Sequence, residues 1–69
     1  MIEVFKTNIE DEQAATSILN QLVSLLPQSL INFDLEDCDK ILRIQNCEVQ
    51  IAAIVKILNQ NGFECERLE

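Results

Sequence analysis

Alternation of apolar and polar residues with a period of two predicts the first element of this chain. Ile2 and Val4 alternate with Glu3 and Phe5, which is typical of a β-strand. Three further stretches either show this alternation or have the length of a strand, and each is bounded by polar or turn-forming residues. The predicted strands are residues 2–7, 30–35, 41–45 and 63–68, and the polar turn 36–40 joins the second and third into a hairpin.

Between these strands, apolar residues recur every three or four positions, which is the spacing of an amphipathic helix. The first helix follows the acidic residues 10–12, which suit the positive end of the helix dipole, and it ends before Pro27. Asn46 is the expected cap of the second helix, and Asn61-Gly62 is its expected stop. The apolar positions are Ala15, Ile18, Leu19, Leu22, Val23, Leu25 and Leu26 in the first helix, and Val49, Ile51, Ala52, Ile54, Val55 and Leu58 in the second.

The predicted order is strand, helix, strand, strand, helix, strand. This order favours an α+β fold, the ferredoxin-like βαββαβ two-layer sandwich, in which two helices cover one face of a four-stranded antiparallel sheet. Right-handed crossovers place the first and third strands at the centre of that sheet. Because the chain has 69 residues, we expect a single domain, 1–69.

The strand period also divides the side chains between the two faces of the sheet. We expect one set to face the helices: Ile2, Val4, Ile31, Phe33, Leu35, Leu42 and Ile44. The other set would face solvent: Glu3, Phe5, Thr7, Asn32, Asp34, Ile41 and Arg43. Phe5, Ile41 and Arg43 then form a candidate interaction surface, because grouped exposed apolar side chains mark partner or dimer contacts. The edge strands are a second candidate, through addition of a partner strand.

Several landmarks along the whole chain resemble the heavy-metal-associated domain, the fold of small copper chaperones and of modules in metal-transporting ATPases. They are Ile18 and Leu22, the Leu26-Pro27 step, and the closing Ile54, Leu58 and Gly62-Phe63. The resemblance implies a Met-x-Cys-x-x-Cys motif in the first loop, where thiolates bind soft metal ions. Ile9, Asp11 and Ala14 stand at its Met and two Cys positions, so neither the thiolate site nor the chaperone activity is carried over.

Charge and cysteine content narrow the function further. The formal net charge of −7 disfavours nucleic acid or an anionic membrane as partner. Because the chain has no His, it lacks the usual general base of an enzyme. The three cysteines show no metal-binding spacing, so we expect a cytoplasmic protein with reduced thiols and no cofactor. Cys47, near a predicted helix N-terminus, is a candidate reactive thiol, although Glu48 beside it opposes a lowered pKa.

These observations leave three hypotheses for the function. The first is a protein-interaction or adaptor module, which binds a protein partner or forms a homodimer. The second is a heavy-metal carrier with non-standard ligands, for which the carboxylates of residues 10–12 offer oxygen atoms to hard cations. The third is a small-molecule sensor that resembles the ACT-type regulatory domains, which share this strand order.

Overall fold

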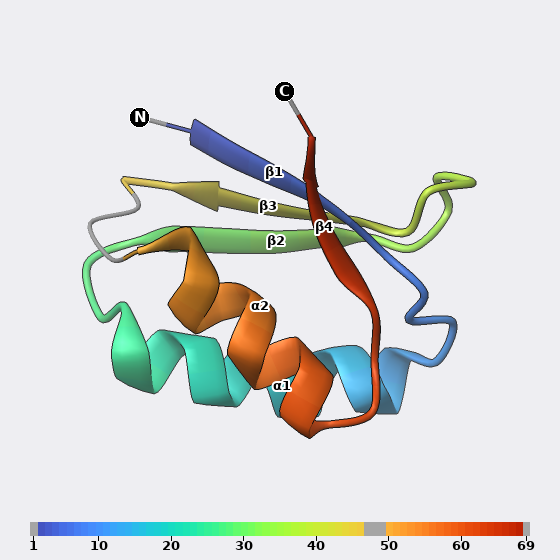
Figure 1. Cartoon of the computed structure of the whole chain (residues 1–69), viewed down its shortest axis with the longest axis horizontal. Helices are drawn as coiled ribbons and strands as arrows, with labels where there is room; N and C mark the ends of the chain where they lie inside the picture. The colour runs from blue at the N-terminus through green and yellow to red at the C-terminus, as the bar shows by residue number, and fades with distance from the viewer. Residues whose placement is uncertain (1, 47–49, 69) are drawn as a thin grey trace.

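The strands and helices follow one another in the predicted order in the computed structural model, which describes residues 2–46 and 50–68 (Figure 1). The four strands form one antiparallel sheet in the order β2-β3-β1-β4, so β1 and β3 are central, as predicted. Both helices cover the same face of this sheet, which makes the fold a ferredoxin-like α+β sandwich. The elements are β1 (Ile2–Thr7), α1 (Glu12–Leu25), β2 (Leu30–Asp34), β3 (Ile41–Gln45), α2 (Ile51–Gln60) and β4 (Cys65–Leu68).

The core lies between the sheet and the two helices. Its most buried side chains come from the central strands, the two helices and the segments next to α1, and apolar residues of the edge strand β2 pack against them. This contiguous cluster is the main source of stability for so short a chain, because burial of apolar surface is the dominant favourable term in folding. The buried members are Phe5, Ile9, Ala15, Ile18, Leu22, Leu26, Leu42, Ile44, Ile54 and Leu58.

The end of α2 is built as predicted, whereas its start is not. Gly62 adopts a left-handed φ of 86°, and the amide of Phe63 donates to the carbonyl of Leu58 at 2.9 Å, so the chain leaves the helix in a glycine-dependent turn. The prediction that Asn46 caps α2 is wrong, because the helix begins at Ile51 after the cap residue Gln50. Asn46 instead takes a φ of 60°, which Asn tolerates better than most residues.

The prediction that Phe5 faces solvent is also wrong, and so is the inward placement of Ile2 and Val4. Phe5 has no exposed surface and pairs with Leu42 on the face that the helices cover. Ile2, one step out of phase with it, is 57 % exposed. Because successive strand residues point to opposite faces, this single difference in phase exchanges the two faces of β1.

Two polar residues of β1, Glu3 and Thr7, share the covered face with Phe5 and are stabilised there by specific partners. Arg67 on β4 approaches Glu3 with its Nε 3.0 Å from a carboxylate oxygen. The buried hydroxyl of Thr7 donates to the carbonyl of Lys40 at 2.6 Å and accepts from the amide of Ile9 at 3.3 Å. These contacts offset the desolvation cost of placing Glu3 and Thr7 on the covered face.

We expect Phe5→Ala to lower the free energy of unfolding by about 3–5 kcal/mol, the usual cost of removing a fully buried aromatic ring. Val4→Ala is the matched control, and its cost should be about 1 kcal/mol because Val4 is only half-buried on the other face. Urea unfolding followed by circular dichroism measures both. If Phe5→Ala fails to fold, Phe5→Val serves in its place, with a loss of about 2–3 kcal/mol that is still well above that of Val4→Ala. Equal losses for the two positions would contradict the phase of β1 described above.

Candidate functional site

The loop between β1 and α1, residues 8–11, lies where the resemblance to heavy-metal-associated domains implies a metal motif. The two polar side chains of this loop that form hydrogen bonds in the described residues, Asn8 and Asp11, have structural roles. Asn8 accepts the amide of Glu64 at 2.8 Å and so joins the loop to the segment before β4. Asp11 accepts the amide of Gln13 at 2.9 Å and is the N-cap of α1. The loop is therefore a joint between three elements.

The three positions that match the family motif lie close together but offer no pair of metal ligands. Ile9 has no exposed surface and belongs to the core. Ala14 is partly buried against that core, and Asp11 is exposed and engaged as the helix cap. Within residues 2–46 and 50–68, the first loop contributes no group of three metal-ligating side chains.

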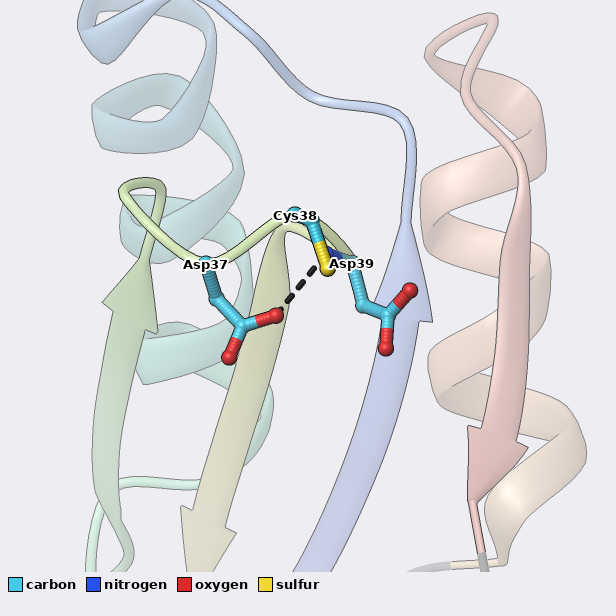
Figure 2. Close-up of side chains that lie close together, drawn as sticks. All are labelled: Asp37, Cys38 and Asp39. Carbon is cyan, nitrogen blue, oxygen red and sulfur yellow. Dashed lines mark hydrogen bonds between the residues drawn. The ribbon is translucent and has the colours of Figure 1, made fainter.

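The group of ligating side chains that the described residues do form lies in the turn between β2 and β3 (Figure 2). The ligating atoms of Asp37, Cys38 and Asp39 lie within 4.8 Å of one another, with the sulfur between the two carboxylates. An oxygen of Asp37 accepts the amide of Asp39 at 2.8 Å, and Lys6 Nζ lies 3.7 Å from an oxygen of Asp39. These contacts shape the turn and attach it to β1, and the ammonium group of Lys6 competes with any cation for Asp39.

The cysteines differ in environment. Cys38 is exposed in the turn, whereas Cys65 is half-buried on β4 against the core. Burial raises the pKa of the Cys65 thiol from 9.0 to about 11, so this thiol stays protonated at neutral pH and is a weak nucleophile. The candidate reactive thiol Cys47 lies outside the described residues.

The face of the sheet opposite the helices, called here the open face, contains two of the three residues of the predicted interaction surface, Ile41 and Arg43. Strand register sorts its residues into three rows that run across the sheet, because directly paired residues of neighbouring strands lie on the same face. The rows are Leu30, Gln45 and Ile2; Asn32, Arg43, Val4 and Leu68; and Asp34, Ile41, Lys6 and Glu66.

Of the predicted surface residues, Ile41 and Arg43 lie on the open face and Phe5 does not. Arg43 is exposed. Ile41 is 7 % exposed, between Lys6 and Asp34 of the neighbouring strands, and lies on the side of the sheet away from the helices. The sequence prediction missed Ile2 and Leu30, which are 57 % and 60 % exposed. Their exposure follows from the phase of β1 and from the position of Leu30 at the start of an edge strand.

The charges on the open face are balanced, unlike those of the whole protein. Lys6 and Arg43 oppose Asp34 and Glu66 in the described rows, so the strand residues of this face contribute no net charge, and Asp39 of the β2–β3 turn lies 3.7 Å from Lys6. The remainder of the chain accounts for the formal charge of −7. The open face therefore combines exposed aliphatic side chains with a locally neutral pattern of charge.

Comparisons of the chain with protein-family models, with curated proteins and with solved structures found no match. Neither α1 nor α2, the helices of the described segments, has the length and apolar character that a membrane span needs. The fold and its strand order define a ferredoxin-like α+β domain.

Asp11 allows the roles of helix cap and metal ligand to be separated. Asp11→Ala should lower the free energy of unfolding by about 1 kcal/mol. Asp11→Asn should lower it much less, because Asn is an equally good helix cap. Thermal unfolding of the reduced protein, with and without Cu(I), Zn²⁺, Ca²⁺ or Mg²⁺, should show no saturable stabilisation in any variant. A stabilisation by one ion that Asp11→Asn abolishes would instead support the metal-carrier hypothesis.

Cys65 should make the protein less stable as the pH rises from 9.0 to about 11. Below this window the thiol is protonated in both states and contributes nothing. Within it, the unfolded chain loses the proton first, so unfolding becomes more favourable. Urea unfolding at intervals across the window should show a steeper decline for the natural chain than for Cys65→Ala. Identical slopes would mean that the thiol has an ordinary pKa.

Proposed function

We propose that this chain is a protein-interaction module that forms a homodimer through the open face of its sheet. In architecture it resembles a heavy-metal-associated domain whose metal site has been replaced by a structural joint. The observation that carries the proposal is the open face itself, a neutral and partly aliphatic surface on a strongly acidic protein. The structural roles of Asn8, Ile9 and Asp11 support the view that the first loop does not hold a metal.

Electrostatics favour this face over the others for self-association. Two copies with a net charge of −7 repel each other at long range, and contact through acidic surfaces adds short-range repulsion. Contact through the open face brings together surfaces with no net charge, on which Lys6 and Arg43 can approach Asp34 and Glu66 of the other copy.

The exposed apolar residues of the open face also favour self-association. A symmetric dimer brings the same patch of both subunits into contact, so exposed Ile2 and Leu30 of one copy can pack against aliphatic side chains of the other. Burial of such side chains contributes about 25 cal/mol per Å² of apolar area. Since few of these side chains are large, the interface belongs with the weak, reversible ones, and the dimer should dissociate on dilution.

Ile2→Lys and Leu30→Lys should each shift the protein toward monomer. Sedimentation equilibrium from about 1 mM to about 1 µM, a range that covers weak interfaces, measures the dissociation constant. We expect about a tenfold increase for each variant, because a lysine replaces a buried aliphatic contact and adds like charge about the symmetry axis.

Val23→Lys is the matched control. Val23 is 47 % exposed on α1, away from the open face, and its replacement changes size and charge in the same way. This variant should dimerise as the natural chain does, or slightly more readily because its net charge is smaller. A natural chain that stays monomeric at the highest concentration, or equal effects of Val23→Lys and Ile2→Lys, would contradict the proposed dimer.

A further inference from the structure

A groove runs along the outer side of β2, beside α1, and it borders the open face at Asn32 and Asp34. Its volume is about 460 Å³. Its floor is formed by apolar side chains of both elements, with Leu19 from α1 and Ile31 and Phe33 from β2. Its acidic residues are Glu12 at the start of α1, Asp34 at the end of β2, and Glu36 just beyond it.

β2 is an edge strand whose outer side is unprotected. It stands at the end of the sheet order, and β3 pairs with only one of its sides. Among the described residues, no hydrogen bond outside the strand ladder uses the backbone of Leu30–Asp34. Proteins usually protect such an edge with Lys, Pro or several charges, but β2 has one charged residue, Asp34, at its end.

The other edge of the sheet differs in both respects. β4 is shorter, and it contains Glu66 and Arg67, of which Arg67 forms an ion pair with Glu3. The hollow beside it is smaller, at about 340 Å³, and is lined by polar or half-buried residues such as Lys6, Glu64 and Glu66. The charged residues of β4 match the usual protection of an edge, so β2 is the edge that is available to a partner strand.

The chemistry beside β2 specifies the partner strand. A strand added to β2 would point alternate side chains into the groove beside Ile31 and Phe33, and the others toward the open face beside Asn32 and Asp34. Apolar side chains fit the first set of positions. Basic side chains fit the second set near Asp34 and the ends of the added segment near Glu12 and Glu36, because the described residues that line the groove include three carboxylates and no Lys or Arg.

We propose that the β2 edge and its groove bind an extended segment of another protein, with alternating apolar and basic residues, by strand addition. Backbone hydrogen bonds to β2 give affinity, and the groove and its carboxylates select the side chains. A second copy of this chain fits less well, because its net charge of −7 is repelled by the same carboxylates. The proposal rests on the proposed role as a protein-binding module but uses a different surface.

The test uses a fluorescent peptide of about eight residues in which Val and Lys alternate, a length that spans an ordinary strand. Two control peptides accompany it: one alternates Val and Glu, and one has the Val/Lys sequence with a central Pro, which keeps the charge but interrupts the ladder. Fluorescence anisotropy measures affinity, and amide chemical shifts of the isotope-labelled Ile2→Lys chain, in which the proposed dimer is weakened, map the contact. We expect saturable binding of the Val/Lys peptide alone, with shifts confined to β2, residues 35–36 and the groove side of α1.

Glu36→Lys should weaken this binding about fivefold, in keeping with the modest value of an exposed charge pair. Glu64→Lys is the matched control, since Glu64 is also exposed outside the helices, lies on the β4 side and changes the net charge equally. Its binding should change less than twofold. Equal loss in both variants would show general electrostatic attraction and overturn the proposed site.

Three other results would also overturn the proposal: no saturable binding, equal binding of the Pro-containing peptide, or amide shifts centred on the open face. Pairing of β2 with β2 of a second copy, seen as concentration-dependent shifts at β2 without peptide, would do the same.

Ile2→Lys separates this proposal from the proposed dimer, because it changes the open face alone. If that variant is monomeric and still binds the peptide, both proposals stand; a natural chain that never dimerises but binds the peptide would leave only the groove.

Discussion

The phase of β1 is the constraint on which the rest of this structure depends. β1 is hydrogen-bonded to both β3 and β4, and Phe5 lies at its centre opposite Leu42 with no exposed surface. Because side chains alternate along a strand, burying Phe5 requires Ile2, Val4 and Lys6 to lie on the open face. The same contact therefore stabilises the core and determines which side chains lie on the open face.

Thr7 connects that constraint to the first loop. Its hydroxyl donates to the carbonyl of Lys40 and accepts from the amide of Ile9, so it connects the β2–β3 turn to the first loop. Ile9 is then buried, and Asp11 is placed to cap the helix. A loop with so many structural contacts has little freedom to rearrange around a ligand, which is why the proposed interaction surfaces are on the sheet.

Most of the architecture could be predicted from sequence because it depends on local patterns. Helical periodicity located Ile18, Leu22, Ile54 and Leu58 in the core, and Gly62 marked the end of α2. The phase of β1 could not be predicted, since both of its faces contain apolar residues. The observed phase buries Phe5 and is accompanied by two long-range contacts, that of Thr7 with Lys40, 33 residues away, and the Glu3–Arg67 ion pair between opposite ends of the chain. The groove could not be predicted for the same reason, because Glu12 and Glu36 line one surface only in the folded chain.

If both proposals hold, the two surfaces cannot be independent, because β2 belongs to both. Leu30, Asn32 and Asp34 face the open side, whereas Ile31 and Phe33 face the groove. A basic strand added to β2 would widen the sheet and bring positive charge to the border of a face that is otherwise balanced. In a dimer, that charge would meet its symmetric copy or lie close to it, and like charges at an interface oppose association. Since coupling between two binding events is reciprocal, dimerisation would weaken strand addition by the same factor. The module would then exchange one partner for the other without any change in its fold.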